Sequence, residues 1–161
     1  MTPHDLDPAE LQRWLDDARI IRVVDRYFRA LDDRQYTEAT FDRVVTPDIR
    51  VIRPNGAVTV GRTAIVESHA RSFTRFAATQ HLLGGHDVDI EGATAIVRAN
   101  LIAIHLWNDR PADANLQDRS FTAGGVVRAA LRRTTEGWRI SELRNDVTWR
   151  TGDVGSMRDT R

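Results

Sequence analysis

Asp32, His81 and His105 are the side chains whose type and setting best suit proton transfer. Asp32 follows the apolar residues Phe28 and Leu31 near the end of a long helical stripe. Partial burial and the negative end of a helix dipole both raise the pKa of a carboxyl group, which suits an acid or base working near neutral pH. The alternative is a surface carboxylate, because Asp is mostly exposed in proteins.

His105 lies on a long alternating segment, residues 94–107. Successive residues of a strand point to opposite faces of the sheet. On one of these faces the side chains are apolar and mostly small, apart from the last two: Ala95, Val97, Ala99, Leu101, Ala103, His105 and Trp107. We therefore expect His105 to face a roomy apolar interior, where an imidazole is well matched to proton transfer at neutral pH. The alternative is a core histidine with one structural partner.

His81 belongs to the segment Thr79-Gln-His, at the start of another predicted strand, residues 80–90. Its alternative is a structural or exposed histidine. His4 in the polar N-terminus, His69 on a predicted helix and His86 after Gly84-Gly85 have weaker claims to a functional role.

The elements that must position these residues follow from hydrophobic periodicity. Asp7 and Pro8 suit the start of a helix whose stripe runs from Leu11 to Leu31. Helices are expected at 38–45 and 63–76, and strands at 49–53, 57–60, 80–90, 94–107, 119–134 and 138–149. A polar loop at 108–118, bends at Gly84-Gly85 and Gly124-Gly125, and a mobile tail at 151–161 complete the prediction.

Helices followed by a long antiparallel meander indicate the α+β class, with N-terminal helices packed on one face of a curved antiparallel sheet. The length of 161 residues fits one domain over residues 1–161, with a core at about 10–152. The outward-pointing side chains of the segment 94–107 are too apolar to face water alone: Ile96, Ile102, Ile104 and Leu106. We expect a partner subunit to cover it in a homodimer or higher homo-oligomer.

Composition excludes several classes of function. Lys+Arg and Asp+Glu are 23 each, so no net charge favours nucleic acid or a membrane surface. The chain has no Cys, which rules out disulfides and thiolate chemistry. No signal-peptide or membrane-spanning pattern is found, and we expect a cytoplasmic protein. Motifs for metals, dinucleotides and phosphates are missing, so we expect neither metal nor cofactor, although a metal held by Asp32, His81 and His105 stays an alternative.

Local motifs resemble one known family. Tyr27–Tyr36 (YFRALDDRQY), Thr79–Gly85 (TQHLLGG) and Ile104–Trp107 (IHLW) are similar to the segments that carry the catalytic residues of SnoaL-like polyketide cyclases and scytalone dehydratase. The closing segments GWRI and NDVTW also resemble this family, and the resemblance covers about residues 10–152. It implies the cone-shaped fold of nuclear transport factor 2 (the NTF2-like fold), with catalytic roles for Asp32, His81 and His105.

The resemblance also implies an activity without a cofactor: dehydration, cyclisation or isomerisation of a polyketide-like or other hydrophobic carbonyl compound. In it, His105 acts as base, Asp32 holds and polarises His105, and His81 donates a proton. The family's two substrate-binding tyrosines fall on Leu31 and Val51, and its asparagine falls near Val127, which suggests a more apolar substrate. We predict a substrate-binding lining of Tyr27, Leu31, Val51, Leu101, Trp107, Phe121, Val127 and Trp149.

Two other functions stay open. One is a ligand-binding module without catalysis, which this fold also supports. The other is an epoxide hydrolase. In a related family with the same fold, that reaction resembles one in which an Asp-Arg-Asp arrangement activates water. Arg98 has the outward parity, and no second aspartate stands clearly on an inward strand position, so the sequence disfavours the epoxide hydrolase.

Overall fold

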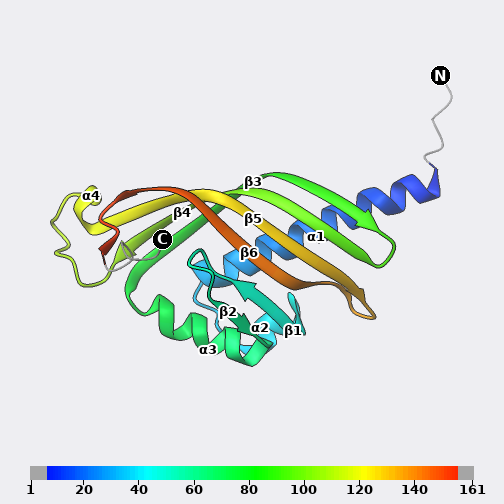
Figure 1. Ribbon diagram of the computed structural model, residues 1–161, viewed down its shortest axis with the longest axis horizontal. Coiled ribbons are helices and arrows are strands. Elements are labelled where there is room, and N and C mark those ends of the chain that lie inside the picture. The colour runs from blue at the N-terminus through cyan, green and yellow to red at the C-terminus, as the bar shows by residue number, and fades with distance from the viewer. Residues whose placement is uncertain (1–6, 156–161) are drawn as a thin grey trace, which may run out of the picture.

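The computed structural model describes residues 7–155 and has an α+β architecture, in which helices pack against one curved sheet (Figure 1). Residues 1–6 and 156–161, which include His4 and most of the predicted mobile tail, lie outside the described residues. The elements are α1 (Pro8–Asp32), α2 (Glu38–Asp42), β1 (Val45–Ile52), β2 (Val58–Val60), α3 (Arg62–Phe73), β3 (Phe76–Glu91), β4 (Thr94–Trp107), α4 (Leu116–Arg119), β5 (Ser120–Thr134) and β6 (Gly137–Gly152).

The first helix forms where its cap and stripe predict it. The Asp7 carboxylate accepts a hydrogen bond from the Ala9 amide at 3.1 Å, and Pro8 occupies the first turn. The C-terminal part of the stripe is buried, from Ile20 to Leu31. The N-terminal part, at Leu11, Trp14 and Leu15, is exposed, because α1 extends beyond the end of the sheet (Figure 1).

The six strands lie in the order β2-β1-β6-β5-β4-β3. The predicted antiparallel meander is confirmed for β3 to β6. One pairing differs from the prediction, because β1 runs parallel to β6 and makes the sheet mixed. A hairpin turn sets the direction of consecutive strands only, and β1 and β6 are far apart in the sequence. β1 also begins at Val45, earlier than predicted, which shortens α2.

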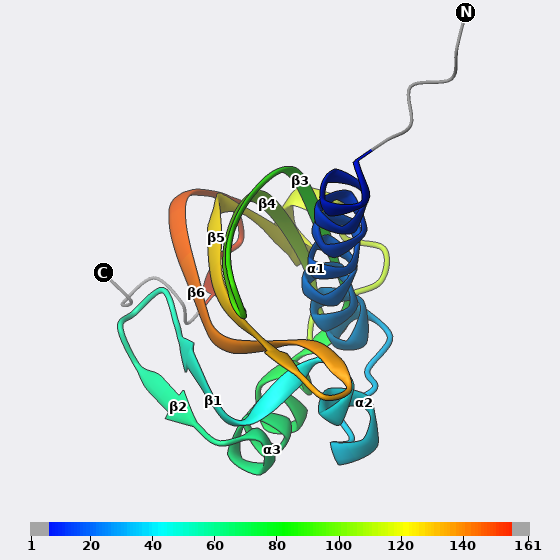
Figure 2. The same cartoon turned by 90° about the vertical axis from the view of Figure 1, so that its right-hand side faces the viewer.

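The sheet is strongly curved, and its concave side faces the helices. Seen end-on in Figure 2, the strands form an arc, α1 closes one side of it, and α2 and α3 lie near β1. The register shifts near Gly84 and between Gly124 and Gly125, so the predicted bends at both glycine pairs are confirmed. On β4 the inward parity from Ala95 to Ala103 is buried, as predicted.

A buried carboxylate ties α1 to the β5–β6 hairpin. Asp16 accepts hydrogen bonds from both terminal nitrogens of Arg133, at 3.1 and 2.6 Å, and from the Trp138 indole at 3.1 Å. The hydrogen bond from Arg133, against the opposing effect of burial, holds the pKa of Asp16 well below its usual value. This contact fixes the helix across the open end of the arc.

Within residues 7–155, no helix has the length and apolar character that crossing a membrane requires.

Candidate functional site

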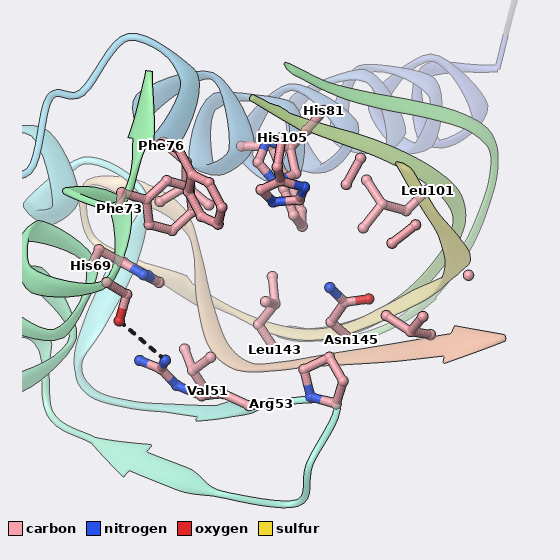
Figure 3. Close-up of a pocket in the computed structure, with 18 of the residues that line it drawn as sticks. Val51, Arg53, His69, Phe73, Phe76, His81, Leu101, His105, Leu143 and Asn145 are labelled. Atoms are coloured by element: carbon pink, nitrogen blue, oxygen red, sulfur yellow. Dashed lines mark hydrogen bonds between the residues drawn. The ribbon is translucent and has the colours of Figure 1, made fainter. Parts of the chain in front are cut away.

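A cavity of about 340 Å³ lies between α1, α3 and the concave face of the sheet (Figure 3). Its walls are largely apolar, with contributions from Phe28, Leu101 and Leu143. Three histidines, His69, His81 and His105, also line the cavity. An apolar cavity with a few convergent polar groups is the usual form of a small-molecule site.

Asp32 and His81 form a hydrogen-bonded pair at the cavity wall. The Asp32 carboxylate, at the end of α1, lies 2.6 Å from His81 Nδ1, and it accepts from the His81 amide at 2.8 Å and from the Thr79 hydroxyl at 2.9 Å. With Nδ1 donating to Asp32, Nε2 is the His81 nitrogen that stays available to a ligand. The Asp32 carboxylate thus sets the tautomer and orientation of the His81 ring.

The pKa of Asp32 moves opposite to the direction that the sequence suggested. Burial raises the pKa, but the hydrogen bonds donated by the His81 side chain and backbone, with that of the Thr79 hydroxyl, lower it further than burial raises it. The net shift is downward, so the Asp32 side chain is a carboxylate at neutral pH. Asp32 is therefore suited to stabilising a protonated His81 and unsuited to donating a proton itself.

His105 lies in an aromatic setting beside His81. Its ring stacks on Phe121 with centroids 4.4 Å apart and planes at 5°, and it lies 4.8 Å from Phe76 and 5.6 Å from the His81 ring. Burial, with a smaller effect of His81, lowers the pKa of His105 to about 3. His105 is therefore a neutral imidazole at pH 7, and its Nδ1 is buried without a hydrogen-bond partner among residues 7–155.

The predicted division of roles between the two histidines is wrong in one respect: Asp32 pairs with His81 and not with His105. The reason is the strand order. β3 is the edge strand that contacts α1, and β4 lies one strand further away. The residue that meets the end of α1 is therefore on β3.

His69 is a further cavity histidine that sequence reasoning undervalued. Its Nε2 lies 2.7 Å from the Tyr27 hydroxyl. Burial lowers the pKa of His69 to about 3 and raises that of Tyr27, so both are neutral at pH 7. The signal was present in the sequence, because Ile65, His69 and Phe73 recur every four residues on the inward side of α3.

Arg53 and Asn145 also line the cavity and were missed (Figure 3). Arg53 follows the last residue of β1, and its guanidinium donates to the hydroxyls of Ser68 and Ser72 on α3. Asn145 shares its inward parity on β6 with Leu143 and Val147, a pattern that could have identified it. The Asn145 side-chain oxygen is buried and has no partner within residues 7–155.

Of the eight residues predicted to bind substrate, five line the cavity: Tyr27, Leu31, Val51, Leu101 and Phe121. The other three do not line it. Val127 is fully buried in the core, and the Trp107 indole donates to the Asp153 carbonyl while its ring packs behind Phe76 and Phe121. Trp149 covers Gly124 and is 47% exposed, because the bulge at Gly124–Gly125 turns it outward.

In the described part of the chain, no three His, Asp or Glu side chains are placed to hold a metal ion. The alternative of a metal bound by Asp32, His81 and His105 is therefore not supported. The geometry instead offers one carboxylate-oriented imidazole, two neutral imidazoles and an amide around an apolar space.

Residues 12–144 match the SnoaL-like domain family. The Kfla4162 protein from Kribbella flavida has a similar structure, with TM-score 0.76 and 24% identity over 86% of this chain and 94% of that one. A Novosphingobium aromaticivorans protein with the provisional name scytalone dehydratase has TM-score 0.74 and 20% identity over 87% of this chain and 89% of that one. An NTF2-like superfamily protein from Salmonella enterica has TM-score 0.71 and 17% identity over 89% of this chain and 97% of that one. These similarities confirm the NTF2-like fold. No curated protein matches the sequence.

Proposed function

Since the chain belongs to the SnoaL-like family, we propose that it is a cofactor-independent acid–base enzyme acting on a hydrophobic carbonyl compound. The observation that carries the proposal is the Asp32–His81 pair, in which Asp32 engages one imidazole nitrogen of a histidine that lines an apolar cavity. The reactions that such a site supports are dehydration, cyclisation and isomerisation, and all three begin with removal of a proton next to a carbonyl group.

His81 is the general base in this proposal. Its Nε2 takes the proton from the carbon next to the carbonyl, and Asp32 stabilises the resulting imidazolium through the 2.6 Å contact to Nδ1. Because the Asp32 carboxyl group has a lowered pKa, it stays ionised through this step. The roles are thus the reverse of those expected from the resemblance.

His105 stabilises the negative charge that develops on the substrate oxygen. A neutral imidazole carries one N–H, and the His105 ring contacts the rings of Phe76 and Phe121 in a partly buried position. A hydrogen bond from this ring to an enolate oxygen is stronger in such a setting than in water. His105 serves as a hydrogen-bond donor here, because a group with a pKa of about 3 is a poor base at pH 7.

Dehydration then needs only one further proton transfer. The enolate expels the hydroxyl group from the neighbouring carbon, and protonated His81 supplies the proton that completes a water molecule. The products are water and an unsaturated carbonyl compound, and His81 returns to its neutral form. If the enolate is conjugated with a further carbon–carbon double bond, His81 can return the proton to the far end of that double bond, and the outcome is isomerisation.

The test is a turnover assay on a panel of hydroxy-ketones and polyketide-like compounds. A matched control exists in the chain, since Asp25 and His86 form a second Asp–His pair with a contact of 3.1 Å that does not line the cavity. Asp32→Asn and His81→Gln should each reduce turnover by about a hundredfold or more, and Asp25→Asn and His86→Gln should leave it unchanged. Saturable binding without turnover of any compound would instead support a binding module.

A further inference from the structure

The wall of the cavity opposite the catalytic histidines carries a cation. Figure 3 shows His81 and His105 on the side of α1 and Arg53 on the opposite side, at the end of β1. The Arg53 guanidinium donates hydrogen bonds to two hydroxyls of α3, those of Ser68 and, at 3.4 Å, Ser72. A side chain fixed in this way is preorganised to receive a ligand.

Among residues 7–155, no acidic side chain neutralises the charge of Arg53. Within residues 7–155, no carboxylate forms an ion pair with it, and its side-chain hydrogen-bond partners are uncharged. A guanidinium has five N–H donors, so several stay available after the two serine contacts. A partly buried cation without a counter-ion is unfavourable, and an anionic ligand would relieve that cost.

The other charged side chains that line the cavity are also positive. The described cavity wall contains three arginines, Arg53, Arg75 and Arg150, and no Asp or Glu side chain. Asp32, the catalytic carboxylate, does not line the cavity, and its oxygens already accept hydrogen bonds from Thr79 and His81. The electric field inside the cavity therefore favours a negatively charged group.

Asn145 extends the same polar patch. β1 and β6 pair in parallel at Ile52 and Arg144, so Arg53 and Asn145 are the next residues on adjoining strands. Both line the cavity, and the amide of Asn145 can donate to the group that Arg53 binds. The charge of Arg53 also contributes to the lowered pKa of His69, after the larger effect of burial, which places the cation close to this wall.

We propose that the substrate is a carboxylic acid, whose carboxylate Arg53 binds in a forked pair while its reacting carbonyl group faces His81 and His105. A planar guanidinium matches the two oxygens of a carboxylate. The proposal rests on the proposed function for the reacting end of the molecule, and it adds the class of substrate. Arg53 would then set which end of the substrate reaches His81.

The experiment measures binding by calorimetry for pairs of aromatic probes that differ only in charge: benzoate with benzamide, and 2-naphthoate with 2-naphthamide. The wild-type protein should bind the acid of a pair at least about tenfold more tightly than the amide. Arg53→Gln should abolish that preference, and Arg53→Lys should keep part of it because the charge stays but the fork is lost. Arg50→Gln is the matched control, since Arg50 is on β1, close to Arg53 in the sequence, but pairs with Glu142 and does not line the cavity.

The outcomes separate this proposal from the proposed function. A wild-type protein that prefers no acid over its amide overturns the carboxylate site, as does a preference that survives in a folded Arg53→Gln protein. Circular dichroism at matched temperature shows whether each variant is folded. Turnover of neutral ketones without acid preference would leave the acid–base function standing alone, whereas acid preference without turnover would leave only the Arg53 site.

Discussion

Two buried neutral histidines predict a loss of stability in mild acid. The pKa values of His69 and His105 each fall from 6.5 to about 3 through burial. Between these values the unfolded chain binds a proton at each histidine and the folded chain does not. The free energy of unfolding therefore falls as the pH drops below 6.5, and the full contribution is present only above that value.

The size of the effect follows from the shift. At pH 5, about 1.5 units below the unfolded pKa, each histidine lowers the free energy of unfolding by about 2 kcal/mol, since one unit corresponds to about 1.4 kcal/mol. The two together give about 4 kcal/mol relative to pH 7.5. Carboxyl groups contribute little in this window, because an unfolded Asp titrates near 3.8.

Urea unfolding followed by circular dichroism at pH 7.5 and pH 5 measures this difference. The comparison protein is the double variant His69→Gln, His105→Phe, in which neither side chain titrates. Gln keeps a polar partner for the Tyr27 hydroxyl, and Phe keeps the stack on Phe121. In the double variant we expect the difference between the two pH values to fall below about 1 kcal/mol.

A wild-type protein equally stable at both pH values would refute the reasoning, because it would mean that the two histidines take up protons in the folded state. A double variant that keeps the full acid sensitivity would refute it as well, since the effect would then arise elsewhere. Each single variant should remove about half of the difference, as expected for two separate sites.

Three further predictions concern the fold and its assembly. Asp16→Asn should lower the free energy of unfolding by about 2–3 kcal/mol in urea titrations, because the buried ion pair is lost, whereas Asp17→Asn should change it little. Gly125→Ala should cost about 1–3 kcal/mol, since a Cβ there would lie 2.2 Å from the Asp146 carbonyl oxygen, whereas Gly84→Ala has open space and should be close to neutral. We propose that the exposed outer row at Ile96 and Ile102 faces a second copy of the chain, so Ile102→Arg should convert a dimer to a monomer in sedimentation velocity.

The layered architecture was predictable because periodicity reports which face of each element is buried. The alternation on β4 placed Ala95 to Ala103 and His105 on the concave side, and the structure agrees. The parallel pairing of β1 with β6 was not predictable in this way. It depends on how two distant segments meet, and no local pattern records that.

The sequence predicted which residues belong to the site, but it did not predict which of them contact one another. Which histidine meets Asp32 depends on the edge position of β3 beside α1, and that is a property of strand order. The downward pKa shift of Asp32 follows from that contact, whereas burial and helix dipole alone suggested the opposite. Trp107 and Trp149 were misplaced because the inward parity does not continue unchanged past a bulge or to the end of a strand.

Arg53 shows a further limit of pattern reasoning. A charged residue directly after a strand is typical of a solvent-exposed turn. Only the packing of α3 against β1 brings Ser68 and Ser72 to the guanidinium and turns it toward the cavity.

The most direct test of the central claim is solvent deuterium exchange at the carbon next to the carbonyl of 1-tetralone, followed by NMR. This measurement reports proton removal by the Asp32–His81 pair without requiring a complete reaction. We predict exchange above the buffer rate in the wild-type protein and a loss of that enhancement by about a hundredfold in Asp32→Asn, with Asp25→Asn unchanged. Exchange at the buffer rate in the wild-type protein, or equal exchange in folded Asp32→Asn, would contradict the account.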